Sequence, residues 1–189
     1  MRAVPAPDSP DTEPDDAALI ARWRAGDERA ATELVARHAD ALARYAVHLG
    51  LQDDVEDLVQ DTFARAFGSL DGFRGESTLR TWLFTIERRL LLDRRRSEQR
   101  RGARHELPLG ERDAVTEYDA LDGLVAVETE ARLRRAVAGL STTQREVFTL
   151  RVAEGMSYGE IAEIAGTTEG AARVHYHNAL RRVKEVIDE

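Results

Sequence analysis

The sequence contains no cysteine, and Lys184 is the single lysine among its 27 basic residues. Without cysteine the chain has no disulfide framework, no thiolate zinc site and no thiol redox switch. Arginine carries the remaining positive charge, either because of genomic base composition or because guanidinium chemistry was selected. No apolar run approaches the roughly 18 residues of a membrane span, and the N-terminus lacks a charged segment followed by an apolar one. We therefore expect a soluble, cytoplasmic protein.

Aromatic residues are also scarce, at 6% of the 189 residues, whereas charged residues make up 33%. This balance fits a helical protein, and the length is that of one or two small domains. Sequence motifs for catalysis are missing, since no glycine-rich phosphate loop, nucleophile elbow or paired-histidine motif occurs. His175 and His177 lie two residues apart on an expected helix and therefore cannot share a metal. We expect no enzymatic activity, no metal and no cofactor.

Charge is distributed unevenly along the chain. Residues 80–104 contain nine arginines and three acids, which is a net charge of +6 in a chain whose net charge is −8. Residues 106–130 contain eight acids and one base. A basic segment on an acidic protein suggests an anionic partner, although an acidic protein should bind free DNA poorly.

Apolar residues recur at three- and four-residue intervals along most of the chain, which predicts an all-α protein with two small helical domains. Residues 1–14 hold four of the five prolines and show no such period, so we expect a disordered tail. The first helical domain is expected over residues 15–101 and the second over residues 124–189. Residues 102–123 between them are expected to form an acidic linker.

The first domain is expected to begin with a short helix, a break at Gly26 and Asp27, and a long helix that ends near Gly50. A third helix follows over residues 53–70, and a fourth runs over residues 78–96, capped by Ser77 or Thr78. The residues expected to be buried on the fourth helix are Leu79, Trp82, Leu83, Ile86 and Leu90, with Arg80, Arg88 and Arg95 pointing away from them.

The second domain has the clearest helix boundaries. Ser141 is expected to cap one helix that Gly155 ends, and Ser157 and Glu160 have the spacing of a capping box for the next helix. A tight turn at residues 166–168 then leads to the final helix. Two helices joined by a short turn with glycine form a helix-turn-helix, whose second helix fits a DNA major groove about 12 Å wide. Plain helical bundles also contain such pairs.

Three segments read DLVQDTFARAF, FRGESTLRTWLFTIERRLLLDRRR and LSTTQREVFTLRVAEGMSYGEIAEIAGTTEGAARVHYHNALRRV. In this order and spacing they resemble bacterial RNA polymerase sigma factors of the extracytoplasmic-function (ECF) type. The two blocks correspond to domain 2 and domain 4 of that family. The resemblance implies a subunit that binds core polymerase, directs it to promoters and helps to open the DNA.

The resemblance further implies that the polar face of the third helix binds the coiled coil of the polymerase β′ subunit. The residues of this face are Asp57, Gln60, Asp61 and Arg65. They lie at helical spacing opposite the apolar residues, which suits a protein partner, although an acidic helix face is commonly just solvated. The polymerase β flap is a further implied contact.

Residues 71–77 and the fourth helix resemble the part of these sigma factors that opens the minus-ten promoter element. Strand opening requires unstacked bases to be held in a pocket or on an aromatic ring while arginines bind phosphates. The expected minus-ten residues are Phe73, Arg74, Glu76, Ser77 and Thr78 for the bases, and Arg80, Arg88, Arg94 and Arg95 for the backbone. We expect Trp82 to pack in the core and Asp93 to form a structural salt bridge. Arg89 replaces the asparagine that is usual in the family, so no base contact is carried over to it.

The resemblance places residues 169–182 in the major groove of the minus-thirty-five element. The expected contact residues are Thr168, Glu169, Arg173, His177 and Arg181. Glu169 can accept from a cytosine amine, and Arg173 can bind either a guanine edge or a phosphate. The sequence departs from the family at residues 174–176, where Val, His and Tyr stand in place of the usual Ser, Arg and Leu.

An alternative is a LuxR-type regulator, because QREVFTLRVAEGMSYGEIAEIAGTT resembles that family too. Such a protein would bind its operator without polymerase, and residues 53–101 would remain unexplained. The sigma-factor interpretation also implies an anti-sigma protein that covers domain 2 or domain 4. The acidic linker either threads the RNA exit path of the polymerase or is solvated.

Overall fold

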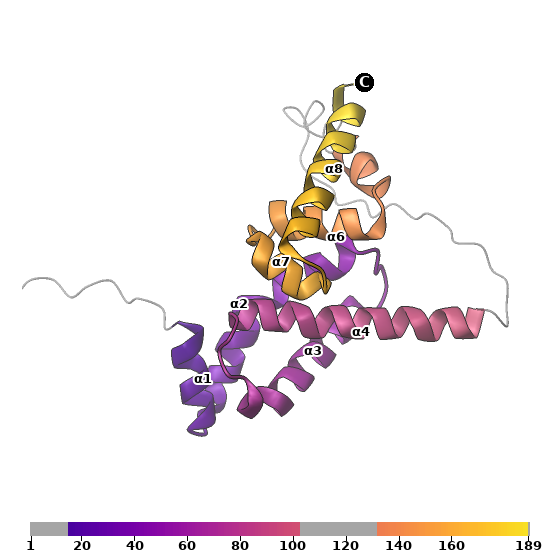
Figure 1. Cartoon of the computed structure of the whole chain (residues 1–189). Helices are drawn as coiled ribbons and strands as arrows, with labels where there is room; N and C mark the ends of the chain where they lie inside the picture. The colour runs from indigo at the N-terminus through magenta and orange to yellow at the C-terminus, as the bar shows by residue number, and fades with distance from the viewer. Residues whose placement is uncertain (1–14, 103–131, 189) are drawn as a thin grey trace, which may run out of the picture. The chain divides into compact units, whose positions relative to one another are not determined.

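The computed structural model describes residues 15–102 and 132–188, and within these ranges every regular element is a helix (Figure 1). The expected all-α fold is therefore confirmed. The expected disordered tail and residues 103–123 of the expected linker lie outside the described residues. The chain divides into two compact units, and the boundary between them, after His38, falls within a helix.

The first unit contains α1 (Asp16–Arg24) and the first half of α2 (Glu28–His48). Asp15 caps α1 by accepting a hydrogen bond from the backbone N–H of Ala18 at 2.7 Å. Gly26 separates the two helices with a φ of +90°, in the left-handed region that glycine adopts without a steric penalty. The break that the sequence predicts at residues 26–27 is present.

The second unit contains the rest of α2, then α3 (Val55–Ser69), the short 3-10 turn η1 (Leu70–Gly72) and α4 (Leu79–Gly102). A helical segment over residues 132–138 follows the undescribed stretch. The last three helices are α6 (Thr142–Val152), α7 (Tyr158–Ala165) and α8 (Glu169–Asp188).

The helix boundaries of the C-terminal part follow from local side-chain chemistry. Ser141 and Gln144 form a capping box at α6, and Ser157 and Glu160 form another at α7. The Ser157 backbone N–H donates to the Glu160 carboxylate at 2.9 Å, and this hydrogen bond is the main reason that the pKa of Glu160 is lowered. Gly166 ends α7 with a φ of +63°. Both expected caps and the expected turn are thus confirmed.

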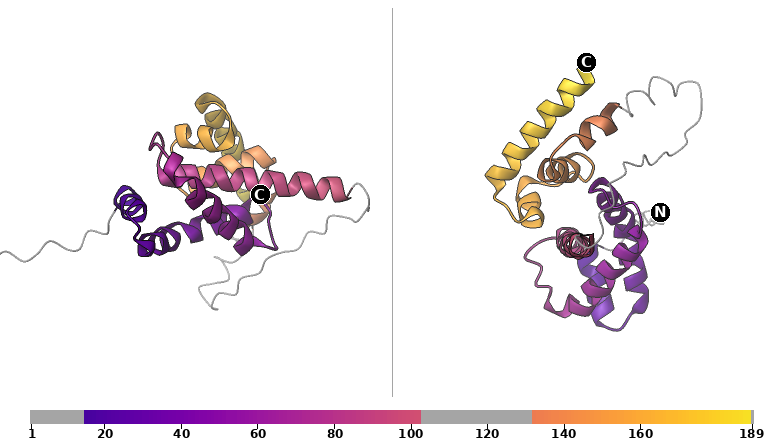
Figure 2. Two further views of the ribbon diagram at one scale, coloured as in Figure 1. Left: turned by 90° about the horizontal axis from the view of Figure 1, so that it is seen from below. Right: turned by 90° about the vertical axis from the view of Figure 1, so that its right-hand side faces the viewer.

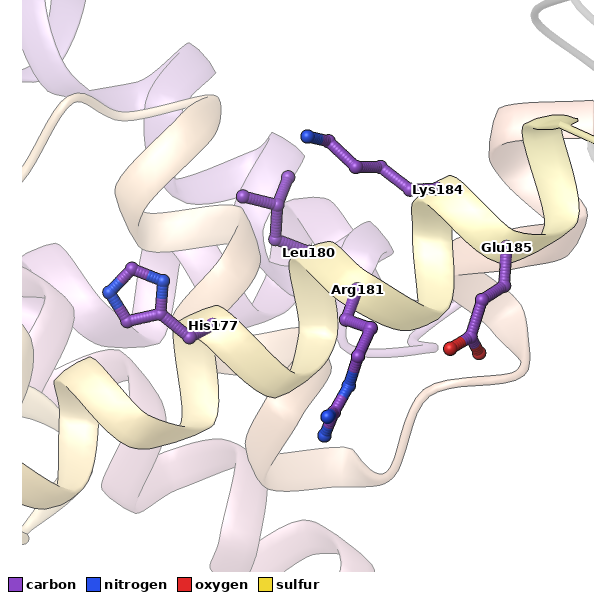
Figure 3. A pocket seen from close by; sticks show the side chains of 5 residues that line it. All are labelled: His177, Leu180, Arg181, Lys184 and Glu185. Carbon is purple, nitrogen blue, oxygen red and sulfur yellow. The ribbon is translucent and has the colours of Figure 1, made fainter.

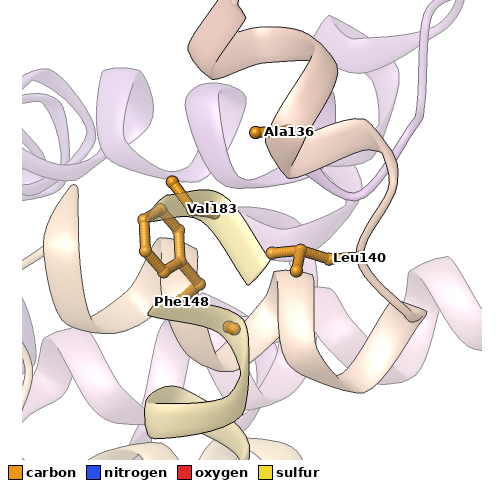
Figure 4. Close-up of a cluster of buried hydrophobic side chains, with 5 residues drawn as sticks. Ala136, Leu140, Phe148 and Val183 are labelled. Atoms are coloured by element: carbon orange, nitrogen blue, oxygen red, sulfur yellow. The ribbon is translucent and has the colours of Figure 1, made fainter. Parts of the chain in front are cut away.

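Helices α6 and α8 pack together with the segment over residues 132–138 around one apolar cluster (Figure 4). Its buried members are Ala136, Leu140, Phe148, Ala179 and Val183. Because α8 buries this face, its opposite face is left open to solvent.

Helix α4 packs against α3 on one side and α7 on another, as the view along its axis shows (Figure 2, right). Because two helices pack on α4, its buried face differs from the single apolar stripe that the sequence predicts. Leu79, Leu83 and Leu90 are buried as expected, but Trp82 and Ile86 are only half-buried. The buried face is wider than predicted and adds Phe84, Glu87 and Leu91, among others.

Candidate nucleic-acid and polymerase interfaces

The helix-turn-helix consists of α7, the turn at Gly166 and α8. Thr168 caps α8, since its hydroxyl oxygen accepts from the backbone N–H of Ala171 at 3.1 Å. The structure places all five expected minus-thirty-five residues on the exposed face of α8 or at its start: Thr168, Glu169, Arg173, His177 and Arg181. The same helix buries Ala172, Ala179 and Val183 on its other side.

The guanidinium of Arg173 is held in place by two contacts. It forms an exposed ion pair with Glu169 at 2.9 Å, and it lies over the ring of Tyr158 at 4.8 Å from the centroid. Arg151 lies over the same ring, also at 4.8 Å. The first turns of α8 therefore present an oriented arginine, which is the side chain best suited to a guanine edge or a phosphate.

Further along α8 a shallow hollow is lined by His177, Leu180, Arg181, Lys184 and Glu185 (Figure 3). Figure 3 shows Arg181 and Lys184 extending from the helix into solvent. Two cations and one acid line this hollow, so the exposed face of α8 stays positive beyond its first turns.

The expected polymerase-binding residues Asp57, Gln60, Asp61 and Arg65 are all exposed on α3. The opposite side of α3 buries Leu58, Thr62, Phe63 and Ala66. Asp61 also accepts from Arg94 of α4 at 2.7 Å, which ties the exposed face of α3 to the basic helix.

An aromatic pair joins the loop before α4 to the first turn of that helix. The rings of Phe73 and Trp82 lie 4.9 Å apart between centroids, and both residues are half-buried. Trp82 is therefore not a core residue, contrary to the expectation, and it supports Phe73 instead. Thr78, rather than Ser77, caps α4 by accepting from the Thr81 backbone N–H at 3.1 Å.

The remaining loop residues are open or partly open. Arg74, Glu76 and Thr78 are exposed, and Ser77 is half-buried. These polar side chains lie within five residues of Phe73 in the sequence, and Phe73 is a partly exposed ring of the kind on which an unstacked base can stack.

The four arginines of α4 that were expected to bind phosphates all have partners within the chain. Arg94 pairs with Asp61 as described, and Arg95 donates to the backbone carbonyl of Leu49. Arg80 donates to the carboxylate of Glu154 and, at 2.8 Å, to its backbone carbonyl. Arg88 donates to the carboxylate of Glu146 at 2.6 Å. No pattern in the sequence indicates Glu146 or Glu154 as partners of these arginines.

Glu87 of α4 is fully buried, and among the described residues neither of its carboxyl oxygens has a hydrogen-bond partner. Burial raises the pKa of this carboxyl to about 9, so it is protonated at neutral pH. Asp93 lies at the exposed surface, where Arg96 is 3.6 Å away. The structural salt bridge expected for Asp93 is therefore an exposed pair that contributes little to stability.

Neither a metal site nor a membrane span is found in the part of the chain that the structure describes. No group of three or more His, Cys, Asp or Glu side chains within residues 15–102 and 132–188 is arranged to hold a metal ion. None of the described helices is both long and apolar enough to cross a membrane.

Comparison with known proteins identifies the family of the chain. The family model for sigma-70 region 2 matches residues 34–101, and that for sigma-70 region 4 matches residues 130–183. The chain is 34% identical over 178 residues to the RNA polymerase sigma factor NccH of Alcaligenes xylosoxydans xylosoxydans, covering 91% of this chain and 94% of that protein. It is 32% identical over 183 residues to the ECF RNA polymerase sigma-E factor of Haemophilus influenzae, covering 92% and 93%.

A solved structure is similar over most of the chain. It is the sigma factor RpoE of Bartonella quintana in complex with the anti-sigma factor NepR, with a TM-score of 0.70 and 31% identity. The match covers 83% of this chain and 96% of that chain. Both parts of the sequence match family models, and the fold is similar to that of a solved sigma factor. We conclude that this protein belongs to the sigma-70 family, as an RNA polymerase sigma factor of the ECF type.

Proposed function

We propose that the chain binds core RNA polymerase, directs it to promoters with minus-ten and minus-thirty-five elements, and helps to open the DNA. The observation that carries this proposal is the presence of two separate surfaces with the chemistry of DNA binding, one around Phe73 and α4 and one on α8. We assign residues 15–101 to sigma domain 2, residues 102–123 to a linker and residues 124–189 to sigma domain 4. The region-2 match covers residues that a LuxR-type regulator leaves unexplained.

The exposed face of α3 is the proposed binding site for the β′ coiled coil. Asp57, Gln60, Asp61 and Arg65 form a mixed polar surface with no large apolar side chain, which suits an interface that steers its partner by charge. Domain 4 is the proposed partner of the β flap. With the polymerase holding both domains, two weak basic surfaces can act on one promoter at the same time.

The loop over residues 73–78 is proposed to hold an unstacked base of the minus-ten element, with Phe73 as the stacking surface. The Trp82 ring lies against the Phe73 ring, and Arg74 follows Phe73 in the chain. The arginines of α4 are proposed to bind the phosphates beside that base. Stacking on an aromatic ring contributes about 1–3 kcal/mol per base.

The exposed side of α8 is proposed to enter the major groove of the minus-thirty-five element. Arg173 is the proposed base reader, because Glu169 and Tyr158 fix its direction. His177 and Arg181 follow at four-residue intervals on the same face, where they can contact the phosphate backbone.

Three further assignments accompany this proposal. The polymerase performs the chemistry, and this chain is not an enzyme. It acts in the cytoplasm, where the polymerase transcribes. An anti-sigma factor is a proposed partner, as NepR is for the similar RpoE.

The test is transcription in vitro with purified core polymerase on genomic DNA of the source organism. We expect transcripts from a small set of promoters only when core and this chain are combined, with footprints at both promoter elements. Equal initiation by core alone contradicts the proposal. A gel shift with the purified chain tests the LuxR-type alternative, because only that alternative requires tight operator binding without polymerase.

A further inference from the structure

One apolar side chain lies open on the side of α8 that the proposed function assigns to the DNA major groove. Val174 has 58% of its surface exposed, the largest exposed fraction among the large apolar residues that the structure describes. Single exposed apolar residues are common on protein surfaces, so exposure alone assigns no role. What distinguishes Val174 is its place, directly after Arg173 and within the first two turns of the helix.

Packing within the described residues makes no use of Val174. Helix α8 buries Ala172, Ala179 and Val183, and Val174 belongs neither to that buried cluster nor to the partly buried residues packed against it. Valine is also a weaker helix former than alanine, leucine or arginine, because its branched side chain loses rotamer freedom in a helix. The Val174 side chain is therefore available to a partner outside the chain.

The residues around Val174 leave it accessible. Its neighbours on the same face of the helix lie three and four residues away, and they include Gly170 before it and His177 after it. Gly170 has no side chain, and the space beside its Cα is open. Because helical side chains lean toward the N-terminus of their helix, Val174 covers the turn that Gly170 leaves bare. A surface with shallow relief can thus approach the valine closely.

Polar and cationic side chains lie on both sides of Val174 along the helix. Arg173 pairs with Glu169 at 2.9 Å, and Arg181 donates to the side chain of Asn178 at 3.0 Å. In a protein–DNA complex, contacts between arginines and phosphates fix the position and orientation of a helix in the groove. A side chain that lies between such arginines is then directed at the edges of the bases.

Valine offers only methyl groups, so it cannot exchange a hydrogen bond with a base edge. In the major groove thymine alone presents a methyl group, whereas cytosine presents an amine and both purines present the acceptor N7. Contact between Val174 and a thymine methyl removes the apolar surface of both groups from water. Against another base, the same contact would cover a polar group that finds no hydrogen-bond partner. The side chain therefore selects thymine both by attraction and by exclusion.

We propose that Val174 is a specificity-determining residue, which contacts the C5-methyl group of one thymine in the minus-thirty-five element. This inference rests on the proposed function, since it assumes that α8 enters the major groove, and it adds the identity of a base. An α-helix rises about 1.5 Å per residue and successive bases lie about 3.4 Å apart, so this thymine lies within about two base pairs of the group that Arg173 contacts.

Replacing thymine by deoxyuridine tests the contact, because the two bases pair alike and differ only in the C5-methyl group. Holoenzyme is assembled from core polymerase and the full chain, and its affinity is measured for promoter duplexes found in the transcription experiment described above. In these duplexes each thymine of the minus-thirty-five element is replaced in turn. The wild type is compared with Val174→Ser, whose hydroxyl can bond to any base edge, and with Val174→Ile, which keeps an aliphatic side chain. Val186→Ser is the matched control, because Val186 is also exposed but lies near the C-terminal end of α8.

We expect deoxyuridine at one position to weaken binding of the wild type about fourfold, which is the effect of one buried methyl group. The same replacement should change the affinity of V174S by less than about 1.5-fold, while V174I and V186S should keep the effect of about fourfold. Any change in DNA shape is common to all variants, so this double-mutant cycle isolates the contact with the methyl group. Far-UV circular dichroism verifies that the variants are folded. An equal deoxyuridine effect in V174S and the wild type would overturn the inference.

The inference and the proposed function fail in different ways. If holoenzyme starts at no specific promoter, the proposed function fails. If it starts at specific promoters with footprints over the minus-thirty-five element, but that element lacks thymine or tolerates deoxyuridine at every position, only the reading of thymine by Val174 fails.

Discussion

The buried carboxyl of Glu87 predicts an unusual dependence of stability on pH. This carboxyl has a pKa of about 9 in the folded chain because burial disfavours its charged form, against an ordinary value of 4.5. Between these two values the unfolded chain releases the proton and the folded chain retains it. Stability should therefore fall as pH rises, by about 1.4 kcal/mol per pH unit, and the cost at pH 7 amounts to roughly 3 kcal/mol.

The substitution Glu87→Gln tests this reasoning, because glutamine has the same size and polarity but cannot ionise. We expect the variant and the wild type to have similar free energies of unfolding near about pH 5, and the variant to be more stable by roughly 3 kcal/mol at about pH 7. The advantage should keep growing until the pH approaches the folded pKa of about 9.

Urea unfolding followed by tryptophan fluorescence is a suitable assay. In a Trp23→Phe background the signal comes from Trp82, which lies on the same helix as Glu87. Glu163→Gln is the matched control, since its side chain is exposed and its pH dependence should parallel the wild type. Parallel curves for Glu87→Gln and the wild type between about pH 5.5 and 8.5 would refute the assignment of a buried, protonated carboxyl.

The other predictions concern the proposed interfaces and one turn. Phe73→Ala should lower promoter opening about tenfold in permanganate footprinting, with unchanged binding to core polymerase, because it removes the proposed stacking ring; unchanged opening argues against base stacking at this position. Arg173→Ala should reduce transcription from a promoter that depends on its minus-thirty-five element roughly tenfold, and a similar loss on a promoter without that element would contradict base reading. Asp57→Ala should weaken binding to core about fivefold in a competition assay while the helix content stays constant, and full retention of affinity would remove this residue from the interface. Gly166→Ala should lower stability by about 1–2 kcal/mol in thermal unfolding, because the φ of +63° disfavours a side chain; an unchanged melting temperature would show that the turn relaxes.

Local features of the fold were predictable because each depends on residues within one helical turn. The capping boxes at Ser141 and Ser157 consist of side chains three residues from the groups they bind. The glycines at positions 26, 50, 155 and 166 adopt positive φ values where the sequence predicts breaks. The exposed faces of α3 and α8 follow in the same way from helical spacing.

The role of α4 was predicted less completely, and Trp82 and Glu87 show why. Helical periodicity identifies one apolar stripe, but it does not tell how many neighbours cover a helix. Because both α3 and α7 pack on α4, Glu87 is buried, although its charge suggested a solvated position. Trp82, at the border of the stripe, pairs with Phe73 from the preceding loop instead of entering the core.

The sequence by itself determined that the chain is helical, where its helices begin and end, and which family it belongs to. These properties depend on short-range spacing and on motifs that can be read along the chain. Only the tertiary structure decided which carboxylates bind Arg80 and Arg88, because their partners lie 74 and 58 residues away and no local pattern specifies them. The choice of partner follows from packing, which brings Glu154 and Glu146 to α4 and buries their carboxylates, so that each of them needs a cationic partner.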